Sequence, residues 1–189
     1  MIFVISGPSG SGKTTLRDKL LEDKELIRGG LTKSVSLTTR PRREGERNKK
    51  DYSFITEAQF KRKLKGKKIL EWTKFLGYHY GTPRDFVDGQ LKKGKSIILC
   101  LDLKGALKIK RIYPHRAVNV FIVPPSLKEL KKRIIGRSKA QEEEIRKRLA
   151  VAKREVVSCG IYDYRVVNSN LSQAVKALKE IIVKERGIN

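Results

Sequence analysis

Residues 7–14 of the chain read Gly-Pro-Ser-Gly-Ser-Gly-Lys-Thr. It is a complete phosphate-loop pattern: two glycines separated by four residues, then Lys and Thr. The apolar residues 2–6 precede it as a strand, and residues 13–22 follow it with the spacing of a helix. A strand, a glycine-rich loop and a helix in this order predict a binding site for the phosphates of a nucleotide.

The chemistry of the loop explains its spacing. Gly7, Gly10 and Gly12 allow a turn tight enough for successive backbone N–H groups to point at a polyphosphate, and the helix N-terminus adds the positive end of its dipole. Lys13 can then reach the β- and γ-phosphates, and the Thr14 hydroxyl is suited to Mg²⁺. An ordinary turn rich in glycine and serine is the alternative, which the coincidence of strand, loop and helix disfavours.

Length and composition indicate one globular domain. The chain has 189 residues, of which 39% are hydrophobic and 34% charged, enough to bury a substantial core. No apolar run approaches the ~18 residues of a membrane span, and no basic leader precedes the first strand, so we expect a cytoplasmic protein. Cys100 and Cys159 form neither a disulfide framework nor a metal-ligand pattern, and two small buried or half-buried thiols are the simpler interpretation.

The formal net charge of +24 is unusual. A strongly basic chain suggests binding to nucleic acid, whereas one active site for phosphorylated substrates would use only a handful of cations. Part of the excess lies in residues 40–68, which hold twelve basic and four acidic residues. Aromatic residues do not alternate with these cations, and no nucleic-acid-binding motif is present. We therefore interpret most of the charge as a solvated face and expect no specific nucleic-acid partner.

Strand and helix patterns alternate along the rest of the chain. Further strands are expected at 34–37, 52–55, 69–72, 97–101, 118–123 and 164–167, and further helices at 56–64, 83–91, 104–112, 127–158 with a break near 136–138, and 171–182. Capping boxes are expected at Thr56 with Gln59 and at Ser126 with Glu129, and Thr82 should cap a helix that begins at Pro83.

This alternation predicts an α/β fold of three layers, with a central parallel sheet, helices on both faces and the ligand at the carboxyl ends of the strands. We expect a single domain whose core is formed by residues 1–31, 84–125 and 151–189. Segments 32–83 and 126–150 are expected to be insertions around the site. The second of these contains helices broken by a basic hinge, which is typical of a lid.

These residues resemble a known family, the nucleoside-monophosphate kinases, and within it the guanylate kinases. The resemblance covers essentially the whole chain and rests on many ordered matches. Besides the phosphate loop they are residues 34–40, Arg43 with Gly45-Glu46, Asp51-Tyr52 with Phe54, Glu71-Trp72, residues 80–82, residues 101–103 with Gly105, residues 124–126, Arg133 with Arg137, Arg148-Leu149, and residues 162–164 with Asn168.

The resemblance implies a P-loop kinase fold and a Mg²⁺-dependent transfer of the ATP γ-phosphate to GMP, and to dGMP, giving ADP and GDP. The partners would be the small molecules ATP and GMP, without a membrane, in a monomer or a homodimer. Segment 32–83 would bind GMP, and segment 126–150 would be the lid.

The resemblance also assigns site residues by position. ATP would be bound by Gly7, Pro8, Ser9, Gly10, Ser11, Gly12, Lys13, Thr14, Thr15 and Asn168, with Thr14 on the metal. The GMP phosphate would be held by Arg40, Arg43, Tyr52 and Tyr80 with help from Ser36, and the guanine by Glu71, Asp102, Ser36 and Thr82. Lys13, Arg40 and the lid arginines Arg133, Arg137 and Arg148 would neutralise the phosphoryl group in transfer.

Physical chemistry agrees with these roles. Arginine presents a planar fork that suits phosphate oxygens. A carboxylate accepts from N1–H and the exocyclic amine of guanine, whereas N1 of adenine is itself an acceptor, so such a site rejects adenine. Without the resemblance, Arg40 and Arg43 would be interpreted as exposed loop charges, Glu71 as a surface strand residue, Asp102 as a strand-end cap, and Arg148 as an ordinary charge on a helix face.

The chain departs from the family pattern at two places. Cys100 stands where the family commonly carries an acidic residue, which affects any carboxylate contribution to the Mg²⁺ site. The family's Arg-x-Pro-Arg is altered to Arg40-Pro41-Arg42-Arg43, with Gly45 and Glu46 still in register.

Three rival functions are open at this stage. A kinase of a phosphorylated sugar would not need both Glu71 and Asp102. A catalytically inactive interaction module typically loses the phosphate loop or the lid arginines, and this chain keeps both. A nucleic-acid-binding protein would show steep salt dependence without competition by nucleotides.

Overall fold

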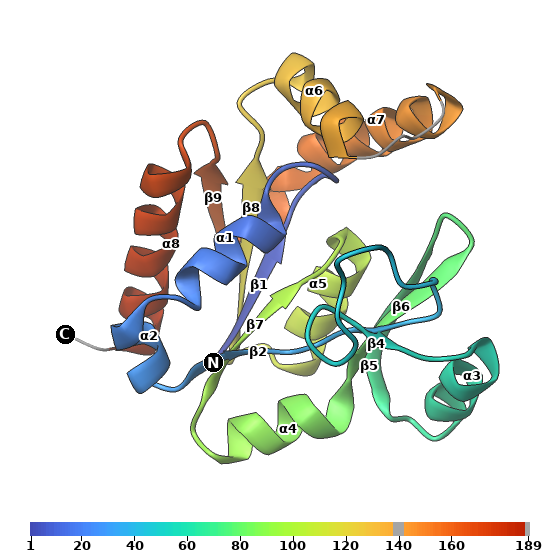
Figure 1. Ribbon diagram of the computed structural model, residues 1–189. Coiled ribbons are helices and arrows are strands. Elements are labelled where there is room, and N and C mark those ends of the chain that lie inside the picture. The colour runs from blue at the N-terminus through green and yellow to red at the C-terminus, as the bar shows by residue number, and fades with distance from the viewer. Residues whose placement is uncertain (138–141, 188–189) are drawn as a thin grey trace.

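The computed structural model describes residues 1–137 and 142–187, together with most of their side chains. Its centre is a parallel sheet of five strands in the order β2-β7-β1-β8-β9 (Figure 1). The strands are β1 (Ile2–Ser6), β2 (Leu31–Lys33), β7 (Ser96–Cys100), β8 (Ala117–Val123) and β9 (Tyr164–Val167). The first strand of the chain therefore lies in the middle of the sheet, which places the phosphate loop at the centre of its carboxyl edge.

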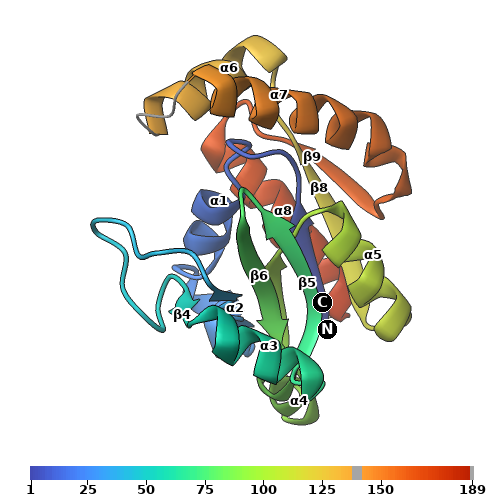
Figure 2. The same cartoon turned by 90° about the vertical axis from the view of Figure 1, so that its right-hand side faces the viewer.

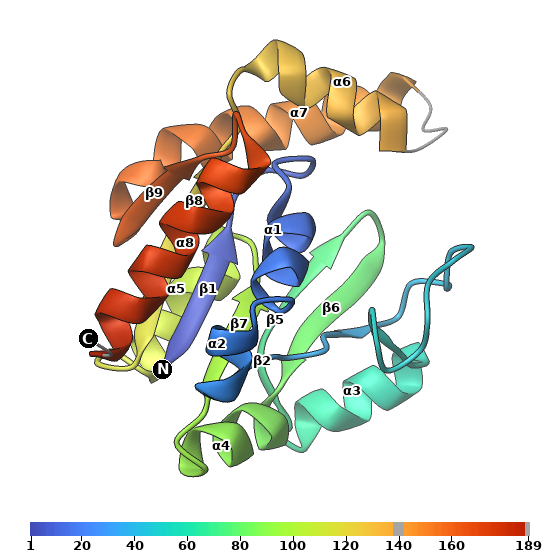
Figure 3. The same cartoon turned by 60° about the vertical axis from the view of Figure 1, so that its left-hand side comes forward.

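Helices cover both faces of this sheet. Successive side chains of β1 point to opposite faces, and apolar side chains lie on both, so both faces need to be covered. Phe3 and Ile5 belong to one apolar cluster with α1 (Lys13–Leu20), α2 (Lys24–Arg28) and α8 (Leu171–Arg186). Ile2 and Val4 belong to the other cluster, with α4 (Arg84–Lys92) and α5 (Leu103–Ile112). Figure 3 shows α1 and α8 side by side on the same face. The expected three-layer α/β fold is confirmed.

A second sheet, with the strand order β4-β3-β6-β5, lies beside the first. Its strands are β3 (Leu37–Thr38), β4 (Ser53–Phe54), β5 (Ile69–Phe75) and β6 (Tyr78–Pro83). Helix α3 (Glu57–Lys65) packs on it through Phe60, which joins Leu37 and Ile69 in a small core. This helix begins with the predicted capping box of Thr56 and Gln59.

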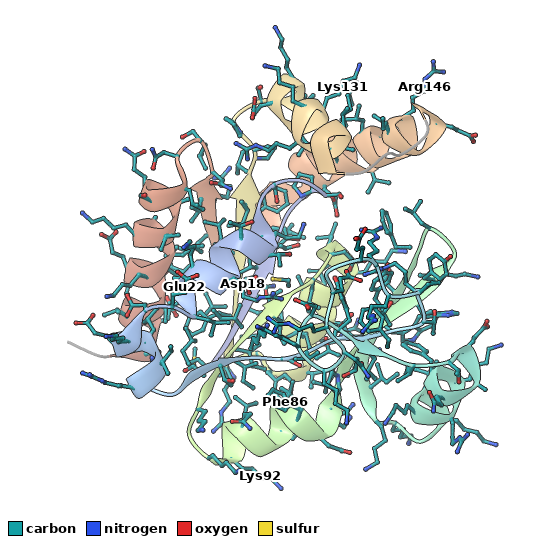
Figure 4. The ribbon with its side chains drawn as sticks, in the orientation of Figure 1. Asp18, Glu22, Phe86, Lys92, Lys131 and Arg146 are labelled. Carbon is teal, nitrogen blue, oxygen red and sulfur yellow. The ribbon has the colours of Figure 1, made fainter. Side chains whose placement is uncertain are left out.

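Two long helices stand at the carboxyl edge of the central sheet. They are α6 (Leu127–Arg137) and α7 (Glu142–Val157), and a 3₁₀ turn, η1 (Ser158–Ile161), follows them. In Figure 2 they run next to each other above the phosphate loop. Leu130, Ile134 and Ala152 form the core between them. Lys131 and Arg146 point outward from this pair in Figure 4, away from the central sheet.

Several expected elements differ from the structure. The strand expected at 34–37 is wrong: β2 ends at Lys33, and β3 begins only at Leu37. Helix α1 ends at Leu20 because Asp23 caps a separate helix, α2, that the sequence pattern missed. The expected capping box at Ser126 is half present, because Ser126 accepts from the N–H of Glu129 while the Glu129 carboxylate pairs with Arg133.

The largest difference is a missed hairpin. Strand β5 continues to Phe75 and returns as β6 through the two-residue turn Leu76-Gly77. Both turn residues have positive φ, 49° and 85°, as a primed hairpin turn requires. Leu is rare at such a position, so the sequence at this turn lacks the Asn-Gly or Asp-Gly pair that usually marks a hairpin turn. The expected cap at Thr82 is also wrong, because Thr82 belongs to β6 and Pro83 is the N-cap of α4.

Candidate active site

The phosphate loop has the backbone that its glycines predict. Gly7, Gly10 and Gly12 have φ of 138°, 87° and 95°, values that favour glycine. A Cβ atom on Gly7 would lie 2.5 Å from the backbone oxygen of Ile122. A Cβ on Gly12 would lie 2.3 Å from Nδ2 of Asn168, so both positions also lack space.

Asn168 supports the loop directly. Its side chain is buried, and Nδ2 donates to the backbone oxygen of Ser11 over 2.8 Å. The Lys13 ammonium donates to the backbone oxygens of Gly7 and Pro8 over 2.6 and 2.9 Å. The lysine therefore lies across the loop, at the place where phosphate oxygens would enter.

One cavity of about 310 Å³ joins several parts of the chain. Its wall comprises Gly7, Ser9, Gly10, Gly12, Lys13 and Thr14 of the loop, Ser36, Tyr52, Glu71, Thr73, Phe75, Tyr80 and Gly81 of the second sheet and its connections, Cys100, Leu101 and Asp102 at the end of β7, and Val151 and Glu155 of α7. The predicted ATP-binding loop and five of the predicted GMP-binding residues (Ser36, Tyr52, Glu71, Tyr80 and Asp102) thus meet at one opening.

The neighbouring cavity, of about 340 Å³, is polar and basic. It shares Ser9, Thr14, Tyr52, Phe75 and Tyr80 with the first and adds Arg17, Arg40, Arg43, Glu46 and Asp51. Because cations and tyrosine hydroxyls converge next to the phosphate loop, this part of the cleft suits a second phosphate group. Thr82, the remaining predicted GMP-binding residue, lines neither cavity and lies behind Glu71.

Arg40 is held rigidly at this second cavity. It is only 8% exposed, so the exposed-loop alternative does not apply to it. Its Nη2 bonds to Oε1 of Glu46 over 2.7 Å, and Nη1 donates to the backbone oxygen of Pro41 over 2.7 Å. The Tyr52 ring lies 5.4 Å from the guanidinium carbon. Burial alone would raise the pKa of Glu46, but the hydrogen bonds from Arg40 and from the Arg43 N–H hold that pKa below its ordinary value.

Glu71 lines the first cavity and is almost fully buried. It is 3% exposed, and its Oε1 accepts from the Thr82 hydroxyl over 2.5 Å. Burial raises the pKa of Glu71 to about 7, and the nearby charge of Asp102 adds to this, although the Thr82 hydrogen bond opposes it. A Cβ on Gly105 would lie 2.9 Å from Oε2 of Glu71, so the first turn of α5 needs glycine to admit the carboxyl.

Asp102 has two roles in the structure. Its Oδ1 accepts from the N–H of Gly105 over 2.8 Å, which makes it the N-cap of α5. The same residue lines the cavity beside Glu71. The strand-end cap, which is the interpretation of Asp102 without the family resemblance, is therefore present. Asp102 lines the cavity at the same time.

The lid arginines are placed only in part. Arg133 donates from Nε to Glu129 over 3.2 Å and approaches the backbone oxygen of Asn168 at 3.5 Å, behind the phosphate loop. It does not line the first cavity. The side chains of Arg137 and Arg148, like that of Cys159, lie outside the described residues. Helix α6 packs on the loop, since a Cβ on Gly10 would meet Ile134 and Leu130 at 3.2 and 3.3 Å.

The sequence reasoning missed five residues of the two walls: Arg17, Thr73, Phe75, Val151 and Glu155. Thr73 and Phe75 alternate with Glu71 along β5, so recognition of the longer strand would have found them. Arg17 lies four residues after Lys13 on the same helix face. Burial raises the pKa of Glu155 to about 7, partly offset by Lys13, but no local motif marks this position.

Two further observations concern the described residues only. Within residues 1–137 and 142–187, no cluster of three or more His, Cys, Asp or Glu side chains could hold a metal by itself. No helix in the same ranges is long and apolar enough to cross a membrane.

Comparisons with known proteins agree with this geometry. The family model described as "Guanylate kinase" matches residues 1–185. A guanylate kinase of Bacillus anthracis is 40% identical over 185 residues, covering 98% of this chain and 88% of that protein. One of Wolbachia pipientis wMel is 40% identical over 186 residues, covering 98% and 90%. The crystal structure of guanylate kinase from Anaplasma phagocytophilum matches with a TM-score of 0.81 at 33% identity, covering 98% of this chain and 86% of that one.

Proposed function

The chain belongs to the guanylate kinase family, and we propose that it transfers the γ-phosphoryl group of ATP to GMP, giving ADP and GDP, in the cleft formed by the two cavities. One observation carries the proposal: the phosphate loop and the pair Glu71 and Asp102 line a single cavity. The reaction needs one site for the phosphates of the donor ATP and another for the guanine of the acceptor GMP. Both proposed sites are on the wall of this cavity.

On the donor side, the phosphate loop binds the polyphosphate of ATP. The backbone N–H groups of residues 7–14 and the N-terminus of α1 supply the positive field, and Lys13 moves from its carbonyl partners to the β- and γ-phosphates. Asn168 fixes the loop from behind through Ser11. Phosphoryl transfer needs positioning and charge neutralisation more than covalent chemistry, and these groups supply both.

On the acceptor side, the two ends of GMP are read by different residues. The second cavity, with Arg40, Arg43, Tyr52 and Tyr80, holds the phosphate. Glu71 and Asp102, together with Ser36 and Thr82, hold the guanine. The ionised Glu71 accepts from N1–H and the exocyclic amine, and adenine would leave the same carboxylate facing an acceptor.

Segments 32–83 and 126–150 form the moving parts of this proposal. The second sheet lies in the first segment, and most of α6 and α7 lies in the second. Closure of both would expel water from the transfer site and bring Arg133, Arg137 and Arg148 to the transferring group. Arg133, which here approaches the backbone oxygen of Asn168 and does not line the first cavity, would move toward the transferring group on closure.

Mg²⁺ fits the residues present. Thr14 offers a hydroxyl at the cavity wall, and Glu155 lines the same wall. Mg²⁺ prefers oxygen ligands and keeps several waters and phosphate oxygens, so it needs few protein groups. The Cys100 thiol is a poor ligand for so hard a cation. When bound, the ion would neutralise phosphate charge.

Action on dGMP and a cytoplasmic location complete the proposal.

The first experiment is an assay of ADP formation with ATP, Mg²⁺ and a panel of GMP, dGMP, AMP, UMP, CMP and ribose phosphates. Turnover confined to GMP and dGMP is expected. Turnover of a ribose phosphate would favour the sugar-kinase alternative, and GMP binding without turnover would favour the inactive-module alternative.

A variant separates the two nucleotide sites. Glu71→Ala should weaken GMP binding and selectivity over AMP much more than ATP binding, and Glu180→Ala, exposed on α8, is the matched control. Equal loss of ATP and GMP affinity in a folded Glu71→Ala protein would contradict the assignment.

A further inference from the structure

Arg17 is a buried cation in the cleft that no predicted role covers. It lies on α1, one helical turn beyond Lys13, and is 9% exposed. Its side chain lines the second cavity together with Thr14 of the phosphate loop and with Arg40 and Arg43. It therefore stands between the loop that binds the donor and the cations proposed for the acceptor phosphate.

The acidic partner of Arg17 among the described residues is one half-exposed carboxylate. Its ion pair among the described residues is with its chain neighbour Asp18, where Nε and Nη2 both approach the single oxygen Oδ1, at 2.8 and 2.7 Å. The Asp18 side chain (Figure 4) is 48% exposed, so water shares that carboxylate. A buried guanidinium is costly unless it is fully paired. A dianionic phosphate in the adjoining cavity would add a second anionic partner to Asp18.

The groups on the other side of Arg17 do not neutralise it. Burial raises the pKa of the Cys100 thiol, which keeps this neighbour uncharged at neutral pH despite Arg17. Lys33 is a further cation: burial first, and then the charge of Arg17, lower its pKa. The second cavity itself is lined by three cations, Arg17, Arg40 and Arg43, and by two acids, Glu46 and Asp51. Glu46 is already paired with Arg40, so the wall carries a net positive charge that suits an anion.

We propose that Arg17 is a substrate-binding residue that contacts the phosphate of the acceptor nucleotide, on the side of that phosphate that faces the phosphate loop. This inference rests on the proposed function and adds to it a third arginine that the family motifs do not include. The five N–H groups of a guanidinium allow Arg17 to keep Asp18 while it donates to phosphate oxygens. The thiol at position 100, where the resemblance leads one to expect an acid, leaves the guanidinium available for that contact.

The test compares two ligands that differ only by the phosphate. Calorimetry without ATP measures the affinities of GMP and guanosine for the wild-type protein, Arg17→Met and Arg17→Lys. Arg17→Met should weaken GMP binding by about 10- to 100-fold, the effect of losing charged hydrogen bonds, and leave guanosine binding unchanged. Lys19→Met, exposed on the same helix, should change neither affinity.

Other outcomes overturn the inference. An unchanged GMP affinity in Arg17→Met, or an equal loss for GMP and guanosine, would show that Arg17 is structural only. If Arg17→Met does not fold, Arg17→Lys decides: a selective loss of GMP affinity supports the contact, because one ammonium cannot replace the planar fork, and wild-type affinities for both ligands refute it.

The same measurements separate this inference from the proposed function. A wild-type protein that phosphorylates GMP, with an Arg17→Met variant that binds GMP normally, defeats the inference alone. A wild-type protein that binds GMP without phosphorylating it defeats the proposed function, and the affinity ratio still decides the role of Arg17. A wild-type protein that binds no GMP refutes both.

Discussion

Replacing Glu71 with glutamine should stabilise the ligand-free protein above neutral pH. The buried carboxyl has a pKa of about 7 in the folded chain, against 4.5 ordinarily, chiefly because burial disfavours its charge. Between these two pH values the folded state keeps a proton that the unfolded state releases. The free energy of unfolding therefore falls as pH rises through this interval. Glutamine keeps the shape of the carboxyl and has no charge to bury.

The size of the effect follows from the shift. The difference between 4.5 and about 7, at about 1.4 kcal/mol for each pH unit, amounts to about 3 kcal/mol. At pH 4.5 the two proteins should differ little in stability, and at pH 8 Glu71→Gln should be the more stable by about that amount. Glu155, whose pKa burial also raises to about 7, adds its own dependence in both proteins, so the comparison between them isolates Glu71.

Urea denaturation of the ligand-free proteins at several values between pH 4.5 and 8 measures this difference. Glu180→Gln, on the exposed side of α8, serves as the control and should run parallel to the wild type. A constant difference between wild type and Glu71→Gln at all pH values would show instead that Glu71 does not titrate in this range. The stabilised variant should bind GMP poorly, because the charge that burial disfavours is the one that guanine needs.

Three other substitutions test further contacts. GMP affinity should rise with pH as Glu71 ionises, and Thr82→Val removes the hydroxyl that lowers the pKa of Glu71. In calorimetry this rise should therefore move to higher pH in the variant. An unmoved profile would show that this hydrogen bond is unimportant. Lys13→Met should lower kcat by about 10²- to 10³-fold, as for other groups that stabilise transition-state charge; steady-state assays of the folded variant that find wild-type kcat would exclude Lys13 from the transfer. Tyr162→Phe deletes the hydrogen bond from Tyr162 to the buried Ser6 hydroxyl and should lower the free energy of unfolding by about 1 kcal/mol, and no change in urea denaturation would count against it.

The parts of the fold that depend on local chemistry could be predicted from the sequence. The phosphate loop needs glycine at each positive φ, and the reciprocal bonds of Thr56 and Gln59 lie within four residues. The hairpin of β5 and β6 could not be found in this way. Its turn places Leu76 at positive φ, and only the pairing of Phe75 with Tyr78 and of Thr73 with Tyr80 fixes the register.

In the candidate site, too, local motifs predicted some residues and only the tertiary structure revealed others. The motifs placed Arg40, Glu71 and Asp102 at the cleft, and the structure adds why Glu71 has a raised pKa: it is buried behind Thr82 and near Asp102, in a hairpin that sequence reasoning did not foresee. Arg17 was overlooked because a basic residue in an amphipathic helix usually faces solvent. Only the tertiary structure, which brings Tyr52 and Tyr80 to the same cavity wall as Arg17, shows that this one is buried.

The central position of β1 has a consequence for synthesis of the chain on the ribosome. β1 is the first strand to be made, but its neighbours β7 and β8 end only at residues 100 and 123. At about 5 to 20 residues per second, an apolar strand with two unpaired edges waits roughly 6 to 23 s for its second partner. During that time it is the segment most exposed to aggregation or to chaperones. The phosphate loop thus acquires its shape late, so nucleotide binding reports that nearly the whole chain has folded.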